Sequence, residues 1–227
     1  MIPTLNTSAL NVPQIGEGIY LPKDVAQILE LNYYKVRNLM NSLWSSKTFG
    51  SKGSRAINFY SLIEFYIYYH LREKGHSTQQ IKTFHKNLST NLNTPYPFAS
   101  INVLDPKKKN KKTKKTKIWY GYNGTIARDD RINQQTISSF VAPFLKQVEF
   151  GDNNIAGRFF PLRHTHNVVV DPHHQFGQPV INGTNLQTKT IFRLYDAGES
   201  KDNICNLYEI TESQVDDAIR LHTRKVA

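Results

Sequence analysis

The sequence contains one cysteine in 227 residues and no run of apolar residues near the roughly 18 that a membrane span requires. A single cysteine, Cys205, excludes an intrachain disulfide framework and a zinc site built from several cysteines. The first 18 residues lack the basic start and apolar stretch of a secretory signal. These absences predict a cytoplasmic protein that does not contact a membrane.

Motifs of the common catalytic sites are missing as well. The sequence has no G-x-S-x-G, no P-loop and no dinucleotide fingerprint, and Cys205 falls on the apolar side of a predicted helix. Four histidines near residue 170 could hold zinc or a redox metal through their imidazoles. Their spacing matches no metal motif, however, and histidines in polar turns are usually solvated. These are His164, His166, His173 and His174. We therefore expect no enzymatic activity, no cofactor and no metal, with a metal-dependent enzyme as the weakest alternative.

Positive charge is concentrated in one part of the chain. Twenty-nine lysines and arginines against 18 acidic residues give a net charge of +11, and eight lysines lie between Lys107 and Lys117. The net charge is +5 over residues 1–100, +7 over 101–160 and −1 over 161–227. A basic balance favours a polyanionic partner. The lysine run predicts an exposed loop over 106–117, either merely solvated or adding salt-sensitive affinity for DNA without specificity.

Residues 20–58 predict a helix-turn-helix followed by a wing. Pro22 stands at a first helical position, and Val25, Ile28 and Leu29 continue one apolar stripe. After a turn at 30–32, a second stripe predicts a second helix through Val36, Leu39, Met40 and Leu43. Residues 45–58 are small, polar and basic with two glycines, which favours a hairpin or wing.

The polar face of the second helix and the wing carry the candidate DNA contacts. Lysine and arginine can bind phosphates, while arginine, asparagine and tyrosine can also reach base edges. The candidates are Tyr33, Tyr34, Lys35, Arg37, Asn38, Asn41, Lys52 and Arg55. The alternative is an ordinary solvated helix face. A small head of this kind normally binds two half-sites, so we expect a homodimer on double-stranded operator DNA.

The rest of the chain predicts an α+β protein that is mainly helical. Residues 59–74 are apolar all round, which predicts a buried helix in the core or at a dimer contact. Ser77 and Gln80 form a capping box for a helix that ends near residue 92. Short apolar segments at 96–104, 118–122, 137–150 and 155–162 predict a β-rich middle region. Near the end, Thr211 to Gln214 form a second capping box.

These patterns predict four regions. Residues 1–18 form an irregular lead-in, 19–92 a winged helix-turn-helix domain, 93–166 the β-rich middle region, and 167–227 a trihelical, homeodomain-like domain. The last two predicted helices also resemble a helix-turn-helix, so either unit could bind DNA. The charge of +5 in the first part against −1 in the last favours the first unit.

Two stretches resemble known families. Residues 20–88 resemble a MerR-type winged helix-turn-helix through the two-helix unit, Phe59-Tyr60, Leu71-Arg72-Glu73-Lys74-Gly75-His76-Ser77 and Ile81-Lys82. Residues 168–222 resemble the bacterial domain-of-unknown-function family 433 through Val170-Asp171-Pro172, Gly177-Gln178-Pro179-Val180-Ile181-Asn182-Gly183-Thr184, Ala197-Gly198-Glu199-Ser200 and Ile204. That family usually has basic residues where this chain has Asn182 and Asn185, so no contact of those side chains carries over.

The combination resembles the antitoxins of VapBC-like toxin–antitoxin pairs. This resemblance implies an antitoxin that represses its own operon and neutralises a PIN-like ribonuclease toxin by direct binding. Because such a nuclease gathers carboxylates around divalent metal, basic residues at the chain end could occupy its site. The candidates are Arg220, Arg224 and Lys225, unless they belong to a frayed end. The alternative function is a stand-alone MerR-like transcriptional regulator without a toxin partner.

Overall fold

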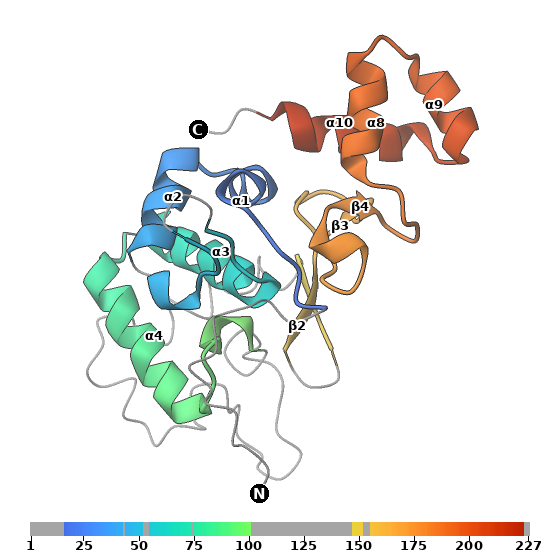
Figure 1. Cartoon of the computed structure of the whole chain (residues 1–227). Helices are drawn as coiled ribbons and strands as arrows, with labels where there is room; N and C mark the ends of the chain where they lie inside the picture. Colours follow the sequence, from blue (N-terminus) through green and yellow to red (C-terminus); the bar gives the residue numbers. More distant parts are fainter. Residues whose placement is uncertain are drawn as a thin grey trace, which may run out of the picture. The chain divides into compact units, whose positions relative to one another are not determined.

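The computed structural model describes residues 16–42, 44–51, 55–73, 75–100, 147–151 and 155–224 (Figure 1). They divide into two compact units, one built from the chain up to residue 59 together with 171 onward, the other from residues 60–170. The described residues contain seven α-helices and small two-stranded sheets, which confirms the predicted class of a mainly helical α+β protein. No helix among them is long and apolar enough to cross a membrane.

The first unit begins with the predicted helix pair, α1 (Pro22–Leu29) and α2 (Tyr33–Asn41). α1 ends because Glu30 adopts the left-handed conformation, with φ 55°. α2 begins at once because the side chain of Asn32 accepts hydrogen bonds from the backbone N–H groups of its second and third residues. The expected tight turn between two amphipathic helices is confirmed.

The predicted hairpin after α2 is also present. A short 3-10 helix, η1 (Ser45–Lys47), leads to Phe49, whose N–H and C=O bond those of Ala56 at 2.8 and 3.0 Å. Ile57 then pairs with Tyr20 through bonds of 2.9 and 3.0 Å, which returns the hairpin to the start of α1. The hairpin tip, residues 52–54, lies outside the described residues.

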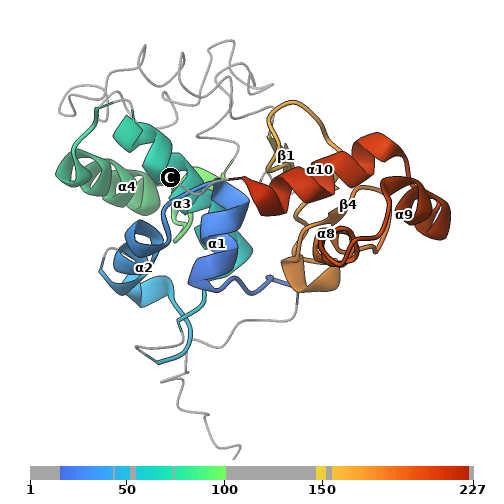
Figure 2. The same ribbon diagram turned by 90° about the horizontal axis from the view of Figure 1, so that it is seen from above.

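The same unit contains the three helices expected near the C-terminus, shown in orange and red in Figures 1 and 2. They follow η3 (Gln175–Gly177) and the short strand β4 (Val180–Ile181). The helices are α8 (Thr188–Asp196), α9 (Lys201–Tyr208) and α10 (Glu212–Thr223). Ser200 caps α9, and Thr211 with Gln214 forms the predicted capping box of α10. Their shared core is formed by Ile191, Ile204, Val215, Ala218 and Leu221.

The second unit holds α3 (Phe59–Glu73) and α4 (Thr78–Leu92). Ser77 and Gln80 form the predicted capping box at the start of α4. The carboxylate of Glu64, fully buried on α3, accepts hydrogen bonds from Nε2 of His85 at 2.5 Å and from the N–H of Phe98 at 2.8 Å. The apolar side chains of α3 are buried as expected, among them Leu62, Ile63, Phe65 and Leu71.

The middle region is only partly described. The strands β1 (Val148–Phe150) and β2 (Ala156–Phe159) pair antiparallel, and β3 (Val168–Val169) follows them. Residues 97–99 form the 3-10 helix η2 (Pro97–Ala99), so the expectation of an extended segment over 96–104 is wrong there. Proline lacks the N–H that a strand ladder requires. The segments expected at 118–122 and 137–146 and the lysine loop 106–117 lie outside the described residues.

Candidate nucleic-acid interface

One face of α2 presents the polar side chains that the sequence nominates for DNA contact. Tyr34, Arg37, Asn38 and Asn41 are exposed and follow the i, i+3, i+4, i+7 spacing of one helix face, with 67% of Tyr34 accessible. Lys35, at the border of this face, is exposed too. The opposite side of the helix is buried through Val36, Leu39 and Met40. We call Tyr34, Lys35, Arg37, Asn38 and Asn41 the α2 face.

The electrostatics of α2 suit a polyanion. The helix carries two cationic residues, Lys35 and Arg37, and no acidic one. Its first turn presents the positive end of the helix dipole, which favours a phosphate. Tyr33 is half-buried, and its ring meets that of Tyr34 edge to face with centroids 5.4 Å apart. It therefore packs against Tyr34 from beside the α2 face and is not itself part of that face.

Arg55 lies in the returning arm of the hairpin and bonds to α2. Its Nη1 donates a hydrogen bond of 3.1 Å to the backbone carbonyl of Met40, at the end of α2. The guanidinium thus attaches the hairpin to the C-terminal part of α2, a role that residue type and spacing did not indicate. Lys52, the other wing candidate, lies outside the described residues.

The second helix-turn-helix-like pair, α9 and α10, has the opposite charge. From the start of α9 to the end of α10, residues 201–223, the chain has five acidic residues and two basic residues, Lys201 and Arg220. That lysine is held by Asp216 at 2.5 Å, and this hydrogen bond raises the pKa of Lys201. Phosphates would be repelled from this region.

The C-terminal arginines nominated for toxin binding have different surroundings. Arg220 is 57% exposed and lies 3.3 Å from the carboxylate of Asp217. Arg224 is only 10% exposed, and its Nη2 donates hydrogen bonds to the backbone carbonyls of Gln27 and Ile28 at 2.6 and 2.8 Å. Lys225 lies outside the described residues. Of the two described arginines, Arg220 is the one with a guanidinium open to a partner.

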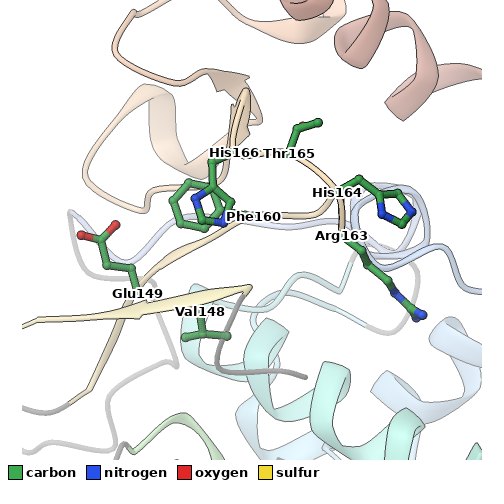
Figure 3. A pocket seen from close by; sticks show the side chains of 7 residues that line it. All are labelled: Val148, Glu149, Phe160, Arg163, His164, Thr165 and His166. Carbon is green, nitrogen blue, oxygen red and sulfur yellow. The ribbon is translucent and has the colours of Figure 1, made fainter. Parts of the chain in front are cut away.

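Two of the four histidines line a pocket in the second unit. Its volume is about 740 Å³, and its walls include Glu149, Arg163, His164 and His166. The ring of His166 stacks on Phe160 with centroids 4.1 Å apart, and Figure 3 shows this pair between Glu149 on one side and Arg163 with His164 on the other. The stacking explains the position of His166 without any metal.

The other two histidines follow Asp171 in the first unit. Its carboxylate accepts a hydrogen bond from the N–H of His173 at 2.9 Å and lies 3.1 Å from Nδ1 of His174, as in a polar turn. Within the part of the chain that the structure describes, no three histidine, cysteine or carboxylate side chains gather as metal ligands. Burial, and then nearby carboxylates, raise the pKa of the Cys205 thiol, so a smaller fraction of it is present as the nucleophilic thiolate.

A strained turn precedes β4 and was not expected. Gln175, Phe176 and Gly177 all have positive φ angles, 47°, 54° and 81°, and the side chain of Phe176 is 77% exposed. A Cβ on Gly177 would lie 2.1 Å from the hydroxyl of Tyr20, a fully buried residue. Burial, and then the carboxylate of Asp171, raise the pKa of Tyr20. The glycine is required because this tyrosine fills the space beneath the turn.

The fold and the C-terminal region define a class of protein. The first unit joins a helix-turn-helix with a hairpin to a small helical domain, and residues 168–221 match the family described as "Protein of unknown function (DUF433)". The chain therefore carries a DUF433 domain over these residues.

Two similar proteins give more specific comparisons than the family match does. The chain is 30% identical over 90 residues to the protein named "Putative antitoxin VapB45" of Mycobacterium tuberculosis, which covers 39% of this chain and 38% of that relative. The fold of this chain resembles the crystal structure of Rv2018 from Mycobacterium tuberculosis, with a TM-score of 0.63. The match has 20% identity and covers 88% of this chain and 96% of the Rv2018 chain. The distant antitoxin-like similarity stated from the residues is thus supported.

Proposed function

We propose that the chain is the antitoxin of a type II toxin–antitoxin pair. Its α2 face binds operator DNA, so that the protein represses its own operon as a homodimer. Its DUF433 domain binds and neutralises a PIN-like ribonuclease toxin. The observation that carries the DNA-binding half is the exposed, acid-free α2 face beside a hairpin. The name of the VapB45 relative supports the toxin-binding half.

A DNA titration with a matched pair of variants tests the first half. The full chain is titrated against the promoter fragment of its own operon and against a scrambled fragment, by fluorescence anisotropy at several salt concentrations. We expect Asn38→Ala to weaken specific binding by roughly 5- to 150-fold, because one good bidentate base contact is worth about 1–3 kcal/mol. Binding to the scrambled fragment should be unchanged, since phosphate contacts carry no sequence information.

The control is Asn206→Ala on α9, where the asparagine is also exposed. We expect it to leave both affinities unchanged. Equal affinity of the unmodified chain for promoter and scrambled DNA would contradict the autorepressor function.

Co-expression with the product of the adjacent gene tests the second half. A stable complex that suppresses that protein's ribonuclease activity would support the antitoxin function, and Arg220→Ala should weaken the complex if this exposed arginine reaches the nuclease's carboxylates. Specific DNA binding without any protein partner would instead favour the stand-alone MerR-like regulator. The mass of the free chain in light scattering reports whether it is a dimer.

A further inference from the structure

The C-terminal end of α10 contacts α1 through two side chains that lie beyond the DUF433 match, which ends at residue 221. His222 and Arg224 bond groups on α1 that are 195 to 197 residues away in the sequence. Figures 1 and 2 both show the end of α10 beside α1. We call the interactions of His222 and Arg224 with α1 the α10–α1 contact.

His222 links α1 to α8 through a directional chain of hydrogen bonds. The amide Nε2 of Gln27 donates to Nδ1 of His222 at 2.5 Å, so the ring carries its proton on Nε2. Nε2 then donates to Oγ1 of Thr188 at 3.0 Å, and this hydroxyl donates to the carbonyl of Pro179 at 3.2 Å. Each donor in the chain finds one acceptor, provided that the imidazole is neutral.

The surroundings of His222 keep it neutral. Phe192 stacks on the ring with centroids 5.1 Å apart, and partial burial, followed by the charges of Lys189 and Arg224, lowers the pKa of His222 to about 4. At ordinary pH the neutral imidazole can accept the hydrogen bond from the amide N–H of Gln27, as the geometry requires.

Arg224 completes the end of α1. The last carbonyls of a helix have no partner within the helix and carry the negative end of its dipole. The guanidinium donates to two of them, those of Gln27 and Ile28, and lies 3.6 Å from the carboxylate of Glu30. Glu30 is the left-handed residue that ends α1, and α2 begins three residues later. Arg224 thus fixes the turn that sets the direction of α2.

We propose that Arg224 and His222 are positioning residues for DNA binding, which hold α1 and its turn so that the α2 face meets DNA in one fixed orientation. Neither side chain touches the DNA in this arrangement. The C-terminal end of α10 would then be part of the DNA-binding head, although it follows a domain whose own helix pair is acidic. The inference rests on the proposed function, since it assigns a role in DNA binding by the α2 face.

The test compares four full-length proteins: the unmodified chain, Arg224→Ala, Arg224→Lys and Arg193→Ala. Arg193 is the matched control because it is an exposed arginine of the same unit, on α8, and no binding role is assigned to it. Promoter affinity is measured by anisotropy, and amide hydrogen exchange is followed along the whole chain. We expect Arg224→Ala to weaken promoter binding by about 3- to 30-fold, the range usual for residues that act through a packed network. Arg224→Lys should restore much of the affinity, because an ammonium can still donate to the carbonyls.

Hydrogen exchange separates positioning from general stability. In Arg224→Ala, faster exchange confined to residues 30–36 supports the positioning role, whereas equally faster exchange throughout the first unit overturns it. Promoter binding by Arg224→Ala equal to that of the unmodified chain, or an equal loss in Arg193→Ala, also overturns it. If the unmodified chain itself binds no DNA, the proposed function fails together with the positioning role, and the exchange data still report whether the α10–α1 contact exists.

Discussion

Two helix pairs in the first unit share one local design and differ in charge. In both pairs the first helix ends at a glutamate in the left-handed conformation, Glu30 with φ 55° and Glu209 with φ 53°. In both, a polar side chain caps the second helix, Asn32 for α2 and Thr211 for α10. Yet α2 has two cationic residues and no acidic one, whereas α10 has three acidic residues and one arginine.

The same helix-turn-helix outline thus occurs twice in this chain with different charge, so the outline alone does not identify a DNA-binding surface. Backbone geometry sets where the second helix points, and side-chain charge decides whether phosphates are attracted to it. The first pair has both properties. The second pair has the outline alone, and its exposed Leu207, 65% accessible, suits a protein contact better than a phosphate.

The largest expected effect comes from reversing a charge on α2. Arg37→Glu should weaken promoter binding by at least about a hundredfold, because it removes a contact worth about 1–3 kcal/mol and adds repulsion from the phosphates. Anisotropy titration at fixed salt measures this loss. The control is Arg193→Glu, the same charge change at an exposed position on α8, which should cost only a few-fold. Equal losses would contradict the assignment of DNA binding to α2.

The next effect concerns the histidine that joins the two pairs. The pKa of His222 is lowered to about 4 in the folded chain, against 6.5 for the ordinary side chain. The unfolded chain therefore takes up this proton first, so stability is lost as pH falls through the window from 6.5 to 4. After a discount for partial exposure, we expect a loss of about 1–2 kcal/mol from this group.

Urea unfolding at pH 7 and pH 4.5 measures this loss. Other carboxylates titrate in the same range, so the informative quantity is the difference between the unmodified chain and His222→Gln, which has no imidazole to protonate. Between pH 7 and pH 4.5 the unmodified chain should lose about 1–2 kcal/mol more of its unfolding free energy than His222→Gln does. The same loss in both proteins would mean that His222 is not held neutral.

A smaller effect separates folding from binding at the two helix caps. Asn32→Ala and Thr211→Ala should each lower the free energy of unfolding by about 1 kcal/mol, because each removes a side-chain cap. Only Asn32→Ala should also weaken promoter binding, since it loosens the first turn of α2. Thermal unfolding and anisotropy together check both statements. A comparable loss of DNA affinity in Thr211→Ala would show that α10 contributes directly to DNA binding.

The smallest effect is expected from the acidic pair. Asp202→Asn combined with Glu212→Gln removes two exposed negative charges from α9 and α10. Promoter affinity should change by less than about twofold, because salt screens charges that lie away from the DNA. A tenfold gain in affinity would mean that this acidic region lies against the phosphates. DNA binding could then no longer be assigned to α1 and α2 alone.

Much of the helical structure could be predicted because its signals are local. Pro22, the capping boxes at Ser77 and Thr211, and the apolar stripes place the helices within a few residues of their observed bounds. The α2 face could be predicted for the same reason, since burial of Val36 and Leu39 exposes the opposite side. The extended segment predicted near residue 97 failed where Pro97 removes a donor.

Side chains that act across long separations could not be predicted. Arg55 was nominated for phosphate binding, and the structure shows its guanidinium bonded to the carbonyl of Met40. Arg224 was nominated for toxin binding, and the structure shows it at the end of α1. In each case residue type indicated a cation able to donate hydrogen bonds, and only the folded chain shows which acceptor it meets.

The sequence by itself determined the helices, their caps, the charge of each region and the residues of the α2 face, because these depend on neighbours within about one or two helical turns. The tertiary structure decided the partners of Arg224 and His222, the neutral state of that histidine, and the strained turn that exposes Phe176 above Tyr20. Such features depend on groups brought together from distant parts of the chain, as when the carbonyls at the end of α1 meet the guanidinium of Arg224.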